Sequence, residues 1–77
     1  MKVKVYAGLK AYFEPMFDIP EAPVSVGELR KKLLLLNPEA EKLLGTCRFA
    51  VVGTFVEDAY GLEEVEEVLV MPPSSGG

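Results

Sequence analysis

The chain has 77 residues, which is enough for one domain, and its hydrophobic content of 49% argues against intrinsic disorder. A formal net charge of −4 disfavours a nucleic-acid partner, and no apolar run is long enough for a membrane span or a signal peptide, so the default location is cytoplasmic. One cysteine and no histidine exclude an internal disulfide and argue against a transition-metal site, so we expect no stably bound cofactor.

The first third of the chain predicts a β-hairpin. Residues 2–7 alternate between apolar and polar, which is the period of a half-buried strand and places Val5 and Ala7 on the same face. A short helical turn over residues 9–13 and a second strand over residues 16–19 follow. The two strands therefore pair across a long, irregular loop.

The middle of the chain predicts helices. Ser25 begins an S-x-x-E pattern, in which the serine oxygen takes the amide of Glu28 and the glutamate reaches back to the amide of Ser25. Apolar residues then recur at helical spacing and predict one buried face, made of Val26, Leu29, Leu33 and Leu36. Asn37-Pro38 ends this helix and starts a shorter one, which Gly45 ends.

The last third of the chain predicts three more strands. Residues 47–52 alternate as a strand, and Gly53 allows a tight turn into residues 54–56. Residues 65–71 are mostly apolar, which indicates a central strand.

This element order predicts an α+β fold of the β-grasp (ubiquitin-like) kind. A first strand beside a last strand, crossed by one main helix, gives a mixed sheet of four to five strands. We expect residues 1–71 to form the β-grasp domain and residues 72–77 to form a flexible C-terminal tail.

The C-terminal tail is the one segment that core packing does not explain. Pro72 and Pro73 favour a stiff, extended exit from the sheet. Gly76 and Gly77 lack Cβ atoms, so they can thread a narrow channel in another enzyme. Activated by ATP as an acyl-adenylate, the terminal carboxylate becomes an electrophile for sulfur or nitrogen. A frayed end or a cloning scar is the simpler interpretation of the dipeptide alone, but the β-grasp pattern favours the chemical one.

The sequence resembles the small subunit of molybdopterin synthase, in the group of ubiquitin-like sulfur carriers that includes the thiamine-pathway carrier. The resemblance runs along the whole chain. Residues 3–10 are similar to the opening strand of that family, and residues 26–29 match the usual start of its helix. The middle strands match at residues 49–51 and 55–56. The most specific match is residues 68–77, an apolar strand that ends in Pro-Pro-Ser-Ser-Gly-Gly, which favours the molybdopterin member.

The resemblance implies a non-catalytic carrier subunit of a sulfurtransferase complex. An E1-like enzyme adenylates Gly77, next to Gly76, and a sulfur-donor enzyme converts the adenylate to a thiocarboxylate. The tail then inserts into the large synthase subunit, which carries the catalytic side chains, in an expected heterotetramer. A cyclic pterin precursor receives the sulfur as a dithiolene, the metal-binding group of the molybdenum cofactor. The expected partner-binding residues are Met71, Pro72, Pro73, Ser74 and Ser75.

Three departures from the family pattern leave the sulfur acceptor open. Val65 stands where a glycine is common, Val52 where an asparagine is common, and Gly8 where a basic residue is common. One alternative is a sulfur carrier for another pathway, such as thiamine synthesis or tRNA thiolation. Others are a ubiquitin-like protein modifier and a non-catalytic β-grasp interaction module.

Two further features have competing interpretations. Cys47 can be a relay thiol, although a lone cysteine in a strand is more often a small buried apolar residue. Four glutamates before the last strand can form a docking patch for a basic partner or an ordinary solvated surface. These glutamates are Glu63, Glu64, Glu66 and Glu67.

The aromatic and basic side chains have simpler expected roles. Tyr6, Phe55 and Met71 can be interface anchors. Core packing is the expected role for any one of them, with Met71 the best candidate for an interface because it lies nearest the tail. We expect Lys10 and the three basic residues 30–32 to be ordinary solubilising charges.

Overall fold

The structure is a computed structural model, and it describes residues 1–73. One mixed sheet has the strand order β2-β1-β5-β3-β4. Strands β1 and β5 pair in parallel at its centre, and the other neighbours are antiparallel. The predicted hairpin, the first strand beside the last and the central last strand are therefore confirmed. The strands are β1 (Lys2–Val5), β2 (Met16–Asp18), β3 (Arg48–Val51), β4 (Thr54–Val56) and β5 (Glu67–Met71).

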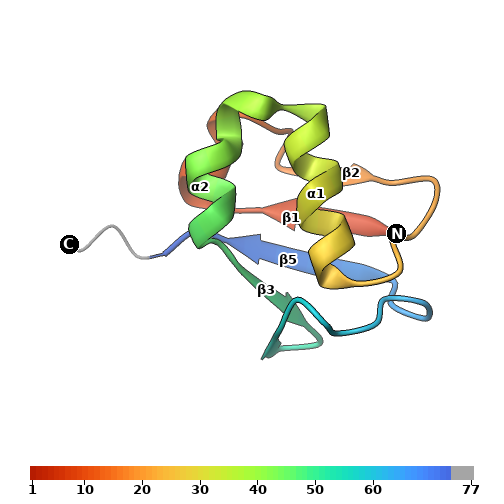
Figure 1. Ribbon diagram of the computed structural model, residues 1–77. Coiled ribbons are helices and arrows are strands. Elements are labelled where there is room, and N and C mark those ends of the chain that lie inside the picture. Colours follow the sequence, from red (N-terminus) through yellow and green to blue (C-terminus); the bar gives the residue numbers. More distant parts are fainter. Residues whose placement is uncertain (74–77) are drawn as a thin grey trace.

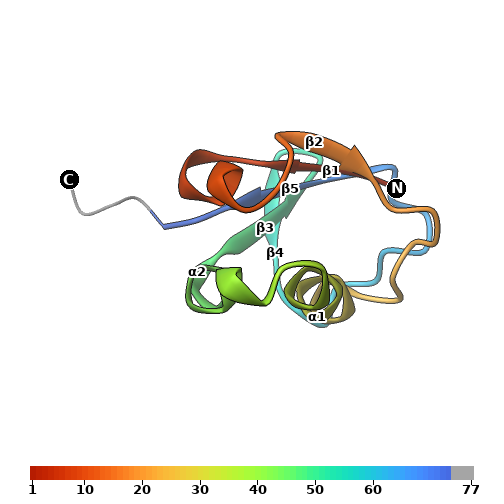
Figure 2. The same cartoon turned by 90° about the horizontal axis from the view of Figure 1, so that it is seen from above.

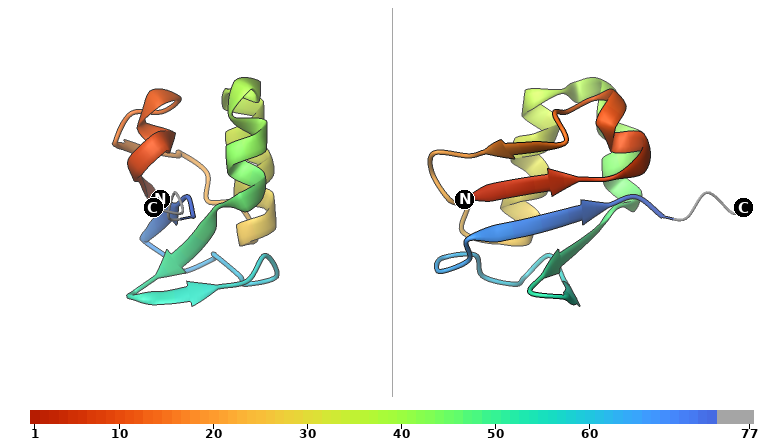
Figure 3. Two further views of the ribbon diagram at one scale, coloured as in Figure 1. Left: turned by 90° about the vertical axis from the view of Figure 1, so that its left-hand side faces the viewer. Right: turned by 180° about the vertical axis from the view of Figure 1, so that it is seen from behind.

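The helices pack against one face of this sheet. Figures 1 and 2 show α1 and α2 on the same side of the strands, and Figure 3 (right) shows the strands in front of both helices when the molecule is seen from behind. The core between the layers includes Val5, Leu29, Phe49 and Val70, each at most 2% exposed. The helices are η1 (Ala7–Ala11), α1 (Val26–Leu36), η2 (Pro38–Ala40) and α2 (Glu41–Thr46).

Helix α1 begins where its cap predicts. The Oγ of Ser25 accepts a hydrogen bond from the amide of Glu28 at 3.3 Å. The Glu28 carboxylate does not complete a capping box, because it lies 3.8 Å from the Nζ of Lys31. Leu36 was predicted to be buried but is 58% exposed, because it lies in the last turn, where the helix ends.

Several predicted boundaries are wrong, and four of them have a clear physical reason. Strand β1 ends before Ala7, which is exposed, because a left-handed φ of 52° at Ala7 turns the chain out of the sheet and into η1. Gly45 does not end α2, since the helix continues to Thr46, whose hydroxyl donates to the carbonyl of Leu43 at 2.9 Å. Strand β3 ends before Val52, whose φ of 48° belongs to the turn. Strand β5 begins two residues after Val65, which packs at the edge of the core.

Candidate functional site

The root of the C-terminal tail lies in the middle of the sheet. Met71 is the last residue of β5 and pairs with Arg48 of β3. On the other side of β5, the amide of Tyr6 donates to the carbonyl of Val70 at 3.2 Å. The backbone before the tail is therefore held on both sides, which fixes the position from which the tail starts.

Three of the predicted site residues lie within residues 1–73, and four lie after Pro73. Met71 and Pro72 are half-buried at the end of β5, and Pro73 is exposed. The predicted residues Ser74, Ser75, Gly76 and Gly77 lie outside the described residues. The chemical and partner-binding roles of all seven positions stay predictions.

We call the sheet face opposite the helices the open face. The tail root, Met71, lies on this face at the end of the central strand. Alternate residues of β1, β3 and β5 point into the core, so the residues between them point to the other side. Cross-strand pairing adds Met16, opposite Lys4, and Phe55, opposite Ala50. The open face consists of Lys2, Lys4, Tyr6, Met16, Asp18, Arg48, Ala50, Phe55, Glu67, Leu69 and Met71.

Several large apolar side chains of the open face are exposed. Tyr6 is 38% exposed, Phe55 is 48% exposed and Met16 is 51% exposed. The expectation that core packing is the role of Tyr6 and Phe55 is wrong, because both are exposed. Phe55 lies on the face of the sheet opposite the core, and Tyr6 follows the buried Val5 just after β1. Such side chains around a defined chain exit are what a protein-docking surface requires.

Arg30 connects three elements behind this face, so the prediction that it is an ordinary solubilising charge is also wrong. Its guanidinium donates to the carbonyls of Leu44 and Cys47 and to the Asp58 carboxylate, the last at 2.8 Å. Its Cζ lies 4.7 Å from the centroid of the Phe49 ring. One signal was available, because position 30 follows the buried Val26 by one helical turn and therefore flanks the buried face of α1.

Cys47 is a buried residue at the junction of α2 and β3. It is 5% exposed, and its Sγ donates to the carbonyl of Leu43 at 3.0 Å. Burial raises the pKa of the Cys47 thiol, an effect that the positive charge of Arg30 partly offsets. The interpretation of Cys47 as a small buried apolar residue is confirmed, and its protonated thiol is a poor nucleophile.

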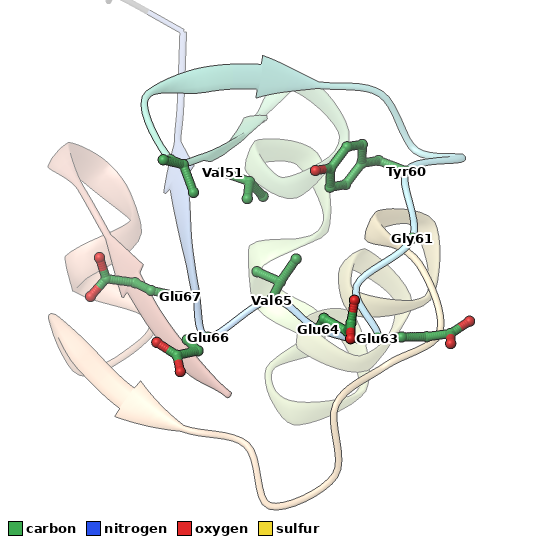
Figure 4. Close-up of a pocket in the computed structure, with 9 residues that line it drawn as sticks. Val51, Tyr60, Gly61, Glu63, Glu64, Val65, Glu66 and Glu67 are labelled. Atoms are coloured by element: carbon green, nitrogen blue, oxygen red, sulfur yellow. The ribbon is translucent and has the colours of Figure 1, made fainter.

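The four glutamates line an open hollow of about 960 Å³ together with Tyr60 and Val65. Figure 4 shows that the carboxylates of Glu63 and Glu67 point in opposite directions, whereas Val65 points toward Tyr60. Among residues 1–73, no group of three acidic, histidine or cysteine side chains could hold a metal ion.

These glutamates stand close to the tail in the sequence but not in the fold. The acidic run precedes β5 in the chain, but strand β5 carries the chain away from it. Glu67 and Met71 lie at opposite ends of this strand, about 13 Å apart at roughly 3.3 Å per residue. The acidic hollow therefore lies at the other end of β5 from the tail root, although it shares Glu67 with the open face.

Comparison with known proteins identifies the fold. No protein-family model matches the chain, and no curated protein matches it. Among solved structures, SAMP1 from Haloferax volcanii is similar, with a TM-score of 0.73 over 99% of this chain and 97% of that chain. The fold is a β-grasp. At 18% sequence identity the likeness establishes the fold alone. Within residues 1–73, no helix has both the length and the apolar character to cross a membrane.

Proposed function

We propose that this chain is a ubiquitin-like sulfur carrier that works through a thiocarboxylate on Gly77. The observation that carries the proposal is the exit of the chain from the sheet. A central strand, held on both sides, ends at Met71 and leads directly into Pro-Pro-Ser-Ser-Gly-Gly. An exposed apolar face around that exit gives a partner enzyme a surface to hold while the tail reaches its active site.

The chemistry has two balanced steps. First, a carboxylate oxygen of Gly77 attacks the α-phosphorus of ATP, and pyrophosphate leaves, so the product is an acyl-adenylate. Second, a sulfide or persulfide sulfur attacks the acyl carbon and AMP leaves. With sulfide the thiocarboxylate forms directly. With a persulfide the product is an acyl disulfide, and a thiol must attack its outer sulfur, which releases the thiocarboxylate and leaves the donor in a new disulfide. The carrier contributes the carboxylate and the docking face, and the activating enzyme contributes the catalytic groups.

The proposed sulfur acceptor is the cyclic pterin precursor of the molybdenum cofactor. In this proposal the chain is the non-catalytic small subunit of molybdopterin synthase and acts in the cytoplasm. Its partners are an E1-like adenylating enzyme, a sulfur-donor enzyme and the large subunit, with which it forms a heterotetramer. The support is the resemblance of residues 68–77, and the alternative acceptors belong to thiamine synthesis and tRNA thiolation.

Intact-mass measurement tests the carrier chemistry. The protein is incubated with ATP, an E1-like activating enzyme and sulfide, and we expect the mass increase that replaces one oxygen by sulfur. The matched control is a variant that lacks Gly77 and keeps the rest of the chain. If the enzyme activates another carrier but leaves this protein unchanged, the chain is an interaction module and the proposal is wrong.

A second candidate function is protein modification. It is favoured by the Gly-Gly end, because an activated Gly77 carboxylate can acylate an amine as well as sulfur. The activation step is the same, but a lysine amine of a target attacks the acyl carbon and forms an amide. Mass spectrometry of digests from cells that express the protein would find lysines joined to Gly77. If such adducts are absent under both sulfur-replete and oxidative conditions, sulfur transfer alone accounts for the activated tail.

A further inference from the structure

Arg48 and Phe55 form a preorganised pair on the open face. The Cζ atom of Arg48 lies 3.8 Å from the centroid of the Phe55 ring, which is the geometry of a cation–π contact. The two residues are diagonal neighbours on β3 and β4, because Phe55 pairs with Ala50, two positions after Arg48. The ring limits the rotamers of an exposed guanidinium, so a partner that binds it loses less conformational entropy.

Arg48 is also the basic side chain at the root of the tail. It pairs with Met71, the last residue of β5. Among residues 1–73, the ion pairs involve Lys4, Arg30 and Lys31, and none involves Arg48. Within the described part of the chain, its guanidinium is therefore stacked on an aromatic ring but not neutralised by a carboxylate.

Because the tail is short, an enzyme that activates Gly77 must approach the sheet near Met71. Residues 72–77 span at most about 20 Å when they are fully extended. An enzyme that encloses the Gly77 carboxylate in a channel must therefore have the mouth of that channel close to Met71. Arg48 lies beside Met71 in the sheet register, and the Phe55 ring stacks on its guanidinium. Leu69 precedes Met71 by two residues on the same face of β5, so the rim of the channel meets all three side chains.

Charge complementarity gives the chemistry of that rim. The whole chain carries a net charge of −4, which would repel an acidic partner at long range. The glutamates of the acidic hollow, however, begin about 13 Å from Met71, beyond the Debye length of about 8 Å at physiological ionic strength. The other basic residue near the tail root is Lys4, opposite Leu69, and its Nζ lies 3.9 Å from a carboxylate oxygen of Glu67. Among residues 1–73, the positive charge left without an ion pair at the tail root is therefore that of Arg48, which pairs best with a carboxylate.

We propose that Arg48 is a docking residue for the adenylating enzyme, which presents a carboxylate at the mouth of its tail channel. An apolar rim of the same enzyme covers Leu69, Phe55 and Met71. This inference rests on the proposed sulfur-carrier function and names the chemistry of its first partner. Arg48 is a positioning residue, because it holds the carrier in place while the chemistry occurs at Gly77.

Steady-state formation of the thiocarboxylate tests this role, with intact mass as the readout and the carrier concentration varied. We expect Arg48→Glu to raise KM at least about tenfold and to leave kcat unchanged, because the charge acts on association and not on chemistry. Phe55→Leu keeps an apolar side chain but removes the ring, so KM rises by a smaller factor. The matched control is Lys31→Glu, which makes the same charge change on α1, where the Lys31 side chain is 76% exposed.

Salt dependence gives a second readout that does not depend on any variant folding. For the wild type, KM rises with NaCl concentration because the Arg48–carboxylate pair is screened. Equal KM values for Arg48→Glu and Lys31→Glu, or a wild-type KM that does not change with salt, would overturn the docking role while the carrier function stands. A wild-type protein that gains no sulfur at all would overturn both proposals.

Discussion

At the scale of single residues, the β3–β4 turn contains an unfavourable residue. Val51 pairs with Thr54, so Val52 and Gly53 form a two-residue hairpin loop. Their φ values are 48° and 76°, and a loop with two positive φ angles is a type I′ turn, which favours Asn-Gly. A β-branched residue in the left-handed region costs about 1–2 kcal/mol. The sulfur carriers that the sequence resembles commonly have asparagine at this position, and the positive φ gives a reason for that preference.

We expect Val52→Asn to stabilise the protein by about 1 kcal/mol, because asparagine tolerates a positive φ. Val52 is 93% exposed, so the substitution removes no core contact. Chemical denaturation measures the change as a higher midpoint at an unchanged m-value. Val52→Thr is the matched control, since it adds a polar group but keeps the β-branch. Equal stabilisation by both variants would show that solvation of the side chain, and not backbone strain, is the cause.

At the scale of elements, Arg30 joins α1 to the end of α2 and to β3. The carbonyl of Leu44 accepts from the amide of Cys47, the C-cap of α2, at 3.3 Å. The Arg30 guanidinium adds a second donor to this carbonyl and donates to the carbonyl of Cys47 as well. Arg30→Met keeps most of the aliphatic stem but removes every hydrogen bond of the guanidinium. We expect it to destabilise the protein by about 2–3 kcal/mol, measured by denaturant unfolding.

Lys31→Met is the control for this prediction, because the Lys31 side chain is 76% exposed and its ion pair with Glu28 is 3.8 Å long. Such a surface pair contributes about 0–1 kcal/mol. If Arg30→Met and Lys31→Met lowered the free energy of unfolding by the same small amount, the hydrogen bonds of Arg30 would not contribute to stability.

The elements also show what sequence patterns can and cannot predict. Apolar–polar alternation was sufficient to predict the five strands and the central position of the last one. Helical spacing and the Ser25 cap were sufficient to predict where α1 begins. The outward direction of Phe55 required the pairing register, which local patterns do not fix. The separation of the acidic run from the tail root required the direction of β5 in three dimensions.

At the scale of the whole molecule, stability and the proposed function belong to different parts of the chain. The buried core extends from Val3 to Val70, and the last described residue, Pro73, is exposed. We expect removal of residues 74–77 to change the free energy of unfolding by no more than about 0.5 kcal/mol, because no core side chain is lost. The same truncation removes Gly77, so it abolishes thiocarboxylate formation completely.

The complementary variant is Leu29→Ala, which leaves the tail intact and opens a cavity beneath α1. Leu29 is fully buried, so the substitution should cost about 2–5 kcal/mol of stability. At a temperature where this variant is still folded, the activating enzyme should convert it to the thiocarboxylate with the wild-type kcat, because the open face and the tail are unchanged. Parallel melting curves and activation assays of the two variants compare both properties. A truncated protein that melted as early as Leu29→Ala would show that residues 74–77 pack on the domain and that the proposed division is wrong.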